Sequence, residues 1–108
     1  MAYYMCQVAY SPEAIRTLIK KPQDRSRVVK AAVEKLGGHL EGFWYCFGQY
    51  DAVLIVDMPD NASAAALPLA AAAAGALRSS ATTVLMTPAE AIVALKLAAS
   101  SGYRPPGK

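Results

Sequence analysis

Cysteine and histidine are scarce in this chain, and their scarcity excludes several kinds of site. The 108 residues include two cysteines, Cys6 and Cys46, and one histidine, His39. Two cysteines are too few for a disulfide scaffold or a common zinc site, so we assign no metal and no cofactor. The strands predicted below hold the thiols about 9–10 Å apart, too far for a disulfide, and we expect both to be inert core residues.

Long hydrophobic runs are also missing. The nearest is residues 61–77, which are mostly alanine and contain Pro68, so we reject a membrane-spanning role. The N-terminus shows neither the basic nor the apolar region of a signal peptide. We therefore expect a cytoplasmic protein without a membrane partner.

Acidic residues are nearly absent from residues 16–35, where seven of the eleven basic residues lie. Asp24 and Glu34 alone oppose them, so this segment carries +5, and since the whole chain carries +3, the rest carries −2. A basic segment can attract nucleic acid or anionic membranes. Here the charges fall on every side of the predicted helices and no aromatic residues are interleaved, which favours a solvated helix surface.

The pattern of apolar residues and capping residues predicts four strands and four helices. Ser11, Asp60 and Thr87 are suitable helix N-caps, and Gly37-Gly38 and Gly75 are suitable helix ends. The predicted strands are residues 1–10, 39–47, 50–58 and 77–87, and the predicted helices are residues 12–20, 23–36, 61–74 and 88–99.

This order of elements is βαββαβ with an extra C-terminal helix, which predicts an α+β, ferredoxin-like fold. Residues 1–99 are expected to form one domain, and residues 100–108 a mobile tail. The order usually yields an antiparallel sheet in which strand four lies beside strand one, then strand three, then strand two. Both main helices are expected on one face of this sheet.

The hairpin around residues 39–58 predicts a dimer. With Gly48-Gln49 as a two-residue type II′ turn, Trp44 lies opposite Val53 and His39 opposite Met58. One strand face then carries Phe43, Tyr45, Phe47, Tyr50, Leu54 and Val56, and the other Leu40, Trp44, Cys46, Asp51, Val53 and Ile55. Both faces are apolar and the helices cover only one, so we expect a second subunit, in a homodimer or a higher oligomer, to cover the other.

Asp51 is a carboxylate at the start of a strongly apolar strand. The predicted register places it about 23 Å from the strand position opposite His39, which excludes an acid/base pair between the two. In the structural interpretation Asp51 anchors the hairpin or the start of the first helix, or pairs with Arg78. In the functional interpretation it forms the polar end of a ligand pocket. The candidate pocket or signature residues are Gly48, Tyr50, Asp51, Arg78, Tyr10 and Trp44.

These residues resemble a known family. The segment GGHLEGFWYCFGQYDAVLIVDMPD, followed by an alanine-rich helix and LRSSATTVLMT, is similar to the GYD domain family, named for a signature matched here by Gly48, Tyr50 and Asp51. The resemblance covers about residues 3 to 88. It implies a small, mostly bacterial protein of uncharacterised function that forms a dimeric α/β-barrel from two ferredoxin-like sheets.

Three functional hypotheses follow. The favoured one is a dimeric binding or interaction module for a small apolar or aromatic molecule, because the sheet is rich in aromatic residues and poor in ionisable groups. The second is a cofactor-independent enzyme of the monooxygenase or isomerase type, with Tyr50 and Asp51 near its substrate. The third is weak nucleic-acid binding through residues 16–35.

Overall fold

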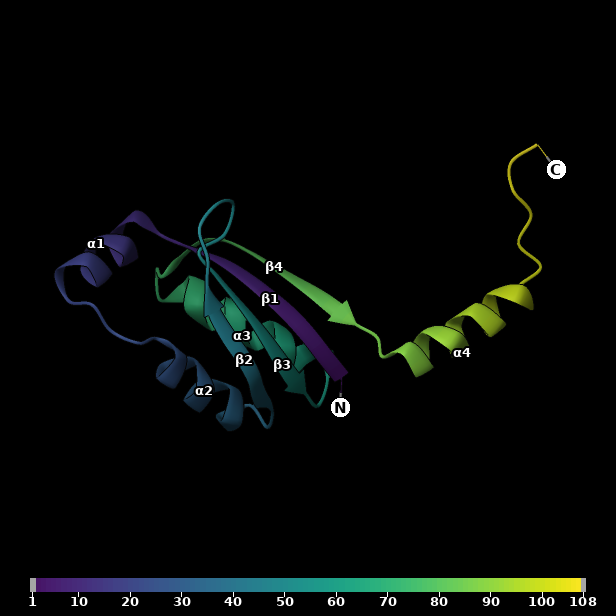
Figure 1. Cartoon of the computed structure of the whole chain (residues 1–108), viewed down its shortest axis with the longest axis horizontal. Coiled ribbons are helices and arrows are strands. Elements are labelled where there is room, and N and C mark those ends of the chain that lie inside the picture. Colours follow the sequence, from purple (N-terminus) through teal and green to yellow (C-terminus); the bar gives the residue numbers. More distant parts are fainter. Residues whose placement is uncertain (1, 108) are drawn as a thin grey trace.

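A computed structural model describes residues 2–107 of the chain. The four strands and four helices expected from the sequence are all present, in the predicted order (Figure 1). They are β1 (Ala2–Tyr10), α1 (Pro12–Lys20), α2 (Ser26–Lys35), β2 (His39–Tyr45), β3 (Ala52–Met58), α3 (Asn61–Ala73), β4 (Leu77–Leu85) and α4 (Pro88–Ala99). Met1, which the sequence placed in the first strand, lies outside the described residues.

The strands form one open antiparallel sheet in the order β2-β3-β1-β4, which confirms the predicted topology. Helices α2 and α3 both lie on the same face of this sheet (Figure 1). The result is a mixed α+β fold compatible with the ferredoxin-like class.

Helix ends follow the predicted capping residues in most places. The side chain of Ser11 accepts a hydrogen bond from the Ala14 backbone, Asp60 caps α3, and Thr87 forms a reciprocal capping box with Glu90 at the start of α4. Helix α2 is the exception, because it begins at Ser26 rather than near residue 23.

The late start of α2 has a local cause. The Asp24 carboxylate accepts hydrogen bonds from both the backbone N–H (2.9 Å) and the hydroxyl (2.6 Å) of Ser26. Such an Asx turn competes with helical hydrogen bonding, so residues 21–25 remain a connection between the two helices. This connection places Arg25 immediately before α2, half-buried.

The tight hairpin turn predicted at Gly48-Gln49 is wrong. Strand β2 ends at Tyr45 and β3 begins at Ala52, so a six-residue loop joins them. Gly48 has φ +139°, far from the φ of about +60° at the first central residue of a type II′ turn, and this backbone region favours glycine. One hydrogen bond, from the Cys46 N–H to the Asp51 carbonyl (2.8 Å), closes the base of the loop.

A bulge at Glu41 also changes the predicted register between β2 and β3. The pairing predicted for Gly42–Tyr45 is confirmed, but beyond the bulge His39 lies opposite Asp57 instead of Met58. The bulge inserts one residue and therefore exchanges the faces of the residues before it. As a consequence, Leu40 lies on the helix-covered face and packs against the core, whereas the sequence placed it beside Trp44 on the other.

The core lies between the sheet and helices α2 and α3. Its buried side chains are Tyr4, Cys6, Val33, Leu54, Val56, Met58 and Ala64. The opposite face of the sheet, here called the open face, carries no helix (Figure 1). By register its central residues are Tyr3, Met5, Gln7, Gly42, Trp44, Val53, Ile55 and Asp57.

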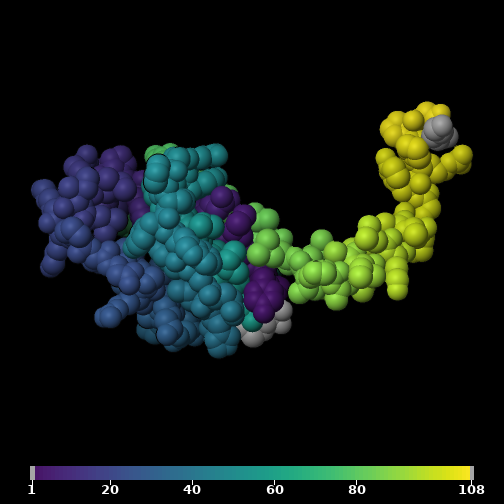
Figure 2. Space-filling model, viewed as in Figure 1, coloured from purple at the N-terminus to yellow at the C-terminus, as the bar shows by residue number. Residues whose placement is uncertain are grey.

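Helix α4 stands away from the body of the molecule, with none of its residues buried (Figures 1 and 2). Its large apolar side chains Ile92, Val93, Leu95 and Leu97 are all more than half exposed. The molecule is consequently long, with principal extents of 59 × 33 × 22 Å. Residues 100–107 after α4 contain no helix or strand.

Candidate functional site

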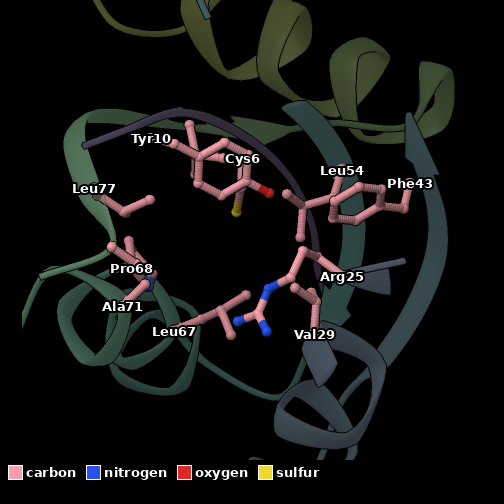
Figure 3. A pocket seen from close by; sticks show the side chains of 12 residues that line it. Cys6, Tyr10, Arg25, Val29, Phe43, Leu54, Leu67, Pro68, Ala71 and Leu77 are labelled. Atoms are coloured by element: carbon pink, nitrogen blue, oxygen red, sulfur yellow. The ribbon is translucent and has the colours of Figure 1, made fainter. Parts of the chain in front are cut away.

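An apolar chamber of about 90 Å³ lies between the sheet and helices α2 and α3 (Figure 3). Strands β1 and β3 form its floor, β2 contributes Phe43, and α3 with the start of β4 closes the far side. Its lining residues are Cys6, Val8, Tyr10, Arg25, Val29, Phe43, Leu54, Leu67, Pro68, Ala71, Ala76 and Leu77.

A second pocket of about 300 Å³, here called the outer groove, adjoins the chamber. The two pockets share Tyr10, Arg25 and Ala76, so these three residues lie at the boundary between them. Apart from these three, the outer groove is lined by Glu13, Ala14, Thr17, Leu18, Gln23, Ala74 and Gly75. The site is therefore an apolar inner chamber with a more polar entrance.

Arg25 is the only charged residue that lines the chamber within residues 2–107. Its guanidinium projects into the space between the sheet and α3 (Figure 3). The backbone N–H of Arg25 donates a 2.9 Å hydrogen bond to the Tyr45 hydroxyl, and its Nη1 donates one of 3.1 Å to Gln23 Oε1. In the described part of the chain no carboxylate pairs with Arg25, since the ion pairs there are Arg16–Glu13 and Lys30–Glu34.

Tyr10 faces Arg25 across the entrance, with its hydroxyl directed into the chamber (Figure 3). Burial raises the pKa of the Tyr10 phenol, and nearby Tyr45 and Asp51 raise it further, while the charge of Arg25 lowers it. Tyr10 is therefore a neutral hydrogen-bonding group at ordinary pH.

Cys6 presents its sulfur to the chamber but is a poor nucleophile. Burial raises the pKa of the Cys6 thiol, and a 3.9 Å contact from the Thr82 hydroxyl opposes this effect only in part. Both cysteines are free thiols, as expected. The prediction that Cys46 is a core residue is wrong, because Cys46 lies in the exposed loop that follows β2.

Asp51 lies beside this site but lines neither pocket. Its Oδ2 accepts a 2.9 Å hydrogen bond from the backbone N–H of Tyr10, and its own N–H donates to the Val8 carbonyl at 2.8 Å. Asp51 thus attaches the hairpin loop to the end of β1, as the structural interpretation of this residue required. The predicted partner Arg78 forms no ion pair within residues 2–107, so the partner of Asp51 is the backbone of Tyr10.

The other candidate residues do not gather around the chamber. Trp44 lies on the open face with its ring over Gly42, and 57% of it is exposed. Tyr50 and Gly48 belong to the hairpin loop, and Arg78 is exposed on β4. Of the six candidates only Tyr10 lines the chamber; Tyr50 and Asp51, which the enzyme hypothesis placed near a substrate, are not among its lining residues.

Sequence reasoning missed the residues that close the chamber from the helix side. Arg25 is the main omission, because it was counted only as one charge among seven in the basic segment. The alternation of Cys6, Val8 and Tyr10 along β1 does indicate one wall. Only the packing of α2 and α3 brings Arg25 and Leu67 against that wall.

The fold and the site define the class of this protein as a small α+β domain with an open antiparallel sheet and an apolar chamber under its helices. The profile of the GYD domain family matches residues 4–95, and the chain therefore belongs to the GYD domain family. A search of curated proteins finds no match. Among the described residues, no helix is long and apolar enough to cross a bilayer, and no cluster of His, Cys, Asp and Glu could hold a metal ion.

Proposed function

We propose that this protein is a binding module for a small molecule with an apolar or aromatic body, held in the chamber between the sheet and the helices. The observation that carries the proposal is the chamber itself, an apolar cavity in which Tyr10 and Arg25 lie on the side shared with the outer groove. Binding pockets typically combine an apolar wall with a few convergent polar groups that orient the ligand.

A chamber-filling variant tests this proposal. Ala71 lines the chamber, whereas its neighbour Ala70 is exposed and lines neither pocket. Ala71→Leu should abolish the thermal stabilisation that a binding small molecule produces, while the control Ala70→Leu should preserve it. Stabilisation of equal size in both variants would place the ligand elsewhere.

We further propose that the protein acts as a homodimer, with a second copy covering the open face. The support comes from the apolar character of that face, where Met5, Val53 and Ile55 lie side by side by register.

Sedimentation velocity tests the dimer. Trp44 is on the open face, so Trp44→Lys should shift the protein from dimer to monomer by placing a charge in the interface. Arg78→Lys, on exposed β4, preserves charge and serves as the control. A wild-type protein that sediments as a monomer at tens of micromolar would end the dimer proposal and leave the chamber unaffected.

A further inference from the structure

The chamber and the outer groove meet at one cation and one hydroxyl, Arg25 and Tyr10. Every other chamber residue is apolar except the Cys6 thiol, and within residues 2–107 no carboxylate lines the chamber. A ligand that occupies the apolar space would therefore lie beside a guanidinium that no carboxylate of these residues pairs with. The question is which chemical group on the ligand suits that position.

We propose that the ligand is a small monocarboxylic acid whose branched aliphatic or aryl end fills the chamber and whose carboxylate binds Arg25 and Tyr10 at the entrance. This inference rests on the proposed binding function and names the class of its ligand. The guanidinium donates two parallel hydrogen bonds to a carboxylate, and the Tyr10 hydroxyl donates a third.

The electrostatics of the entrance favour an anion over a neutral group. A ligand that binds beside a half-buried guanidinium displaces water from it. A carboxylate compensates for the lost water with its negative charge, whereas a neutral group does not. The single acidic residue in the lining of the outer groove is Glu13, whose carboxylate lies 3.7 Å from Arg16 and is largely exposed. Asp51 is bonded to the Tyr10 N–H and Asp24 to Ser26; neither lines a pocket, and no ion pair joins Arg25 to a carboxylate within residues 2–107.

The size of the chamber restricts the apolar end of the ligand. An apolar cavity of about 150 Å³ holds benzene, and the chamber measures about 90 Å³. A branched chain of a few carbons fits this space, and an aryl group fits when its edge extends toward the outer groove. The suitable probes are therefore 3-methylbutanoate and phenylacetate, each compared with its own neutral amide.

The experiment is isothermal titration calorimetry at neutral pH with the two acids and with 3-methylbutanamide and phenylacetamide. The acids should bind about tenfold or more tightly than the amides, because hydrogen bonds to charged groups contribute at least that factor. Arg25→Gln should remove this preference, so that each acid and its amide bind with equal affinity. The matched control is Arg27→Gln, because Arg27 is also basic, lies two residues away and is exposed outside both pockets.

The outcomes separate the inference from the proposed function. Equal binding of acids and amides to the wild type would overturn the carboxylate assignment while the binding function stands, and this comparison needs no variant. A preference for acids that survives in Arg25→Gln, or that disappears equally in Arg27→Gln, would also overturn it. Stabilisation by neutral apolar compounds together with exclusion of both acids would refute it, and failure of every apolar compound to bind would refute the proposed function as well.

Discussion

Substitution of Asp51 distinguishes an anchoring carboxylate from a catalytic one. In the structure Asp51 Oδ2 accepts the Tyr10 N–H at 2.9 Å in a partly buried position. Asp51→Ala removes the acceptor and leaves this amide without a partner at the end of β1. A hydrogen bond to a charged acceptor contributes about 1.5–3 kcal/mol, and water can compensate in part at this depth, so the expected loss of unfolding free energy is about 2 kcal/mol.

Urea denaturation and thermal melting both measure this loss. For a chain of this length, 1 kcal/mol corresponds to about 4 °C in Tm, so Asp51→Ala should melt about 8 °C below the wild type. Asp51→Asn retains a carbonyl oxygen that can accept the same hydrogen bond, and it should lose only about 1 kcal/mol because the charge is gone.

The control is Glu34→Ala, because Glu34 is an exposed carboxylate in a weak surface ion pair with Lys30. Its effect should stay within about 0.5 kcal/mol. If Asp51→Ala were as stable as Glu34→Ala, the hydrogen bond to Tyr10 would not support the fold. The anchoring role argued here would then be refuted, and a functional role for the carboxylate would return.

Three further predictions follow from burial, packing and ionisation. Burial raises the pKa of Tyr10 above its unfolded value near 10, so the unfolded state loses its phenolic proton first and the free energy of unfolding falls as pH rises above about 10. Tyr10→Phe should reduce this fall, whereas Tyr103→Phe, at an exposed site, should not. Cys46 is exposed and Cys6 is buried, so a thiol reagent such as DTNB should modify one cysteine rapidly and the second only after unfolding. Equal rates for the two cysteines, or rapid modification of the single remaining thiol in Cys46→Ser, would contradict the burial of Cys6. A Cβ at Gly38 would overlap the sulfur of buried Met58 and the Asp57 carbonyl. Gly38→Ala should therefore lower the free energy of unfolding, measured by urea denaturation, by about 2 kcal/mol. A change below about 0.5 kcal/mol would show that the neighbouring atoms move aside without cost.

The helices and the strand order could be predicted because local chemistry specifies them. Ser11, Asp60 and Thr87 each accept a hydrogen bond at a helix start, and that signal is visible in a few consecutive residues. The order of the strands follows from the alternation of elements and from the rules of chain connection. Neither kind of inference requires knowledge of distant contacts.

The hairpin loop and the chamber could not be predicted in the same way. Gly48 indicated a turn, and the predicted pairing of Cys46 with Asp51 is present, but no tight turn follows it, and Asp51 also bonds to β1 through Val8 and Tyr10. The bulge at Glu41 reversed the face of Leu40. Gly42 follows it, and a glycine inside a strand can mark a bulge, but the predicted register did not use this signal. Arg25 reaches the chamber from the connection before α2, through packing that the local sequence does not reveal.

The signature residue Asp51 and the proposed binding site are connected through one residue. Asp51 accepts the backbone N–H of Tyr10, and the side chain of Tyr10 forms one side of the chamber entrance opposite Arg25. A residue that anchors the hairpin therefore also positions the hydroxyl that would bind a ligand. Asp51→Ala should consequently weaken ligand binding as well as stability, whereas Gly38→Ala, which acts at the opposite end of β3, should lower stability and leave the affinity of the folded protein unchanged.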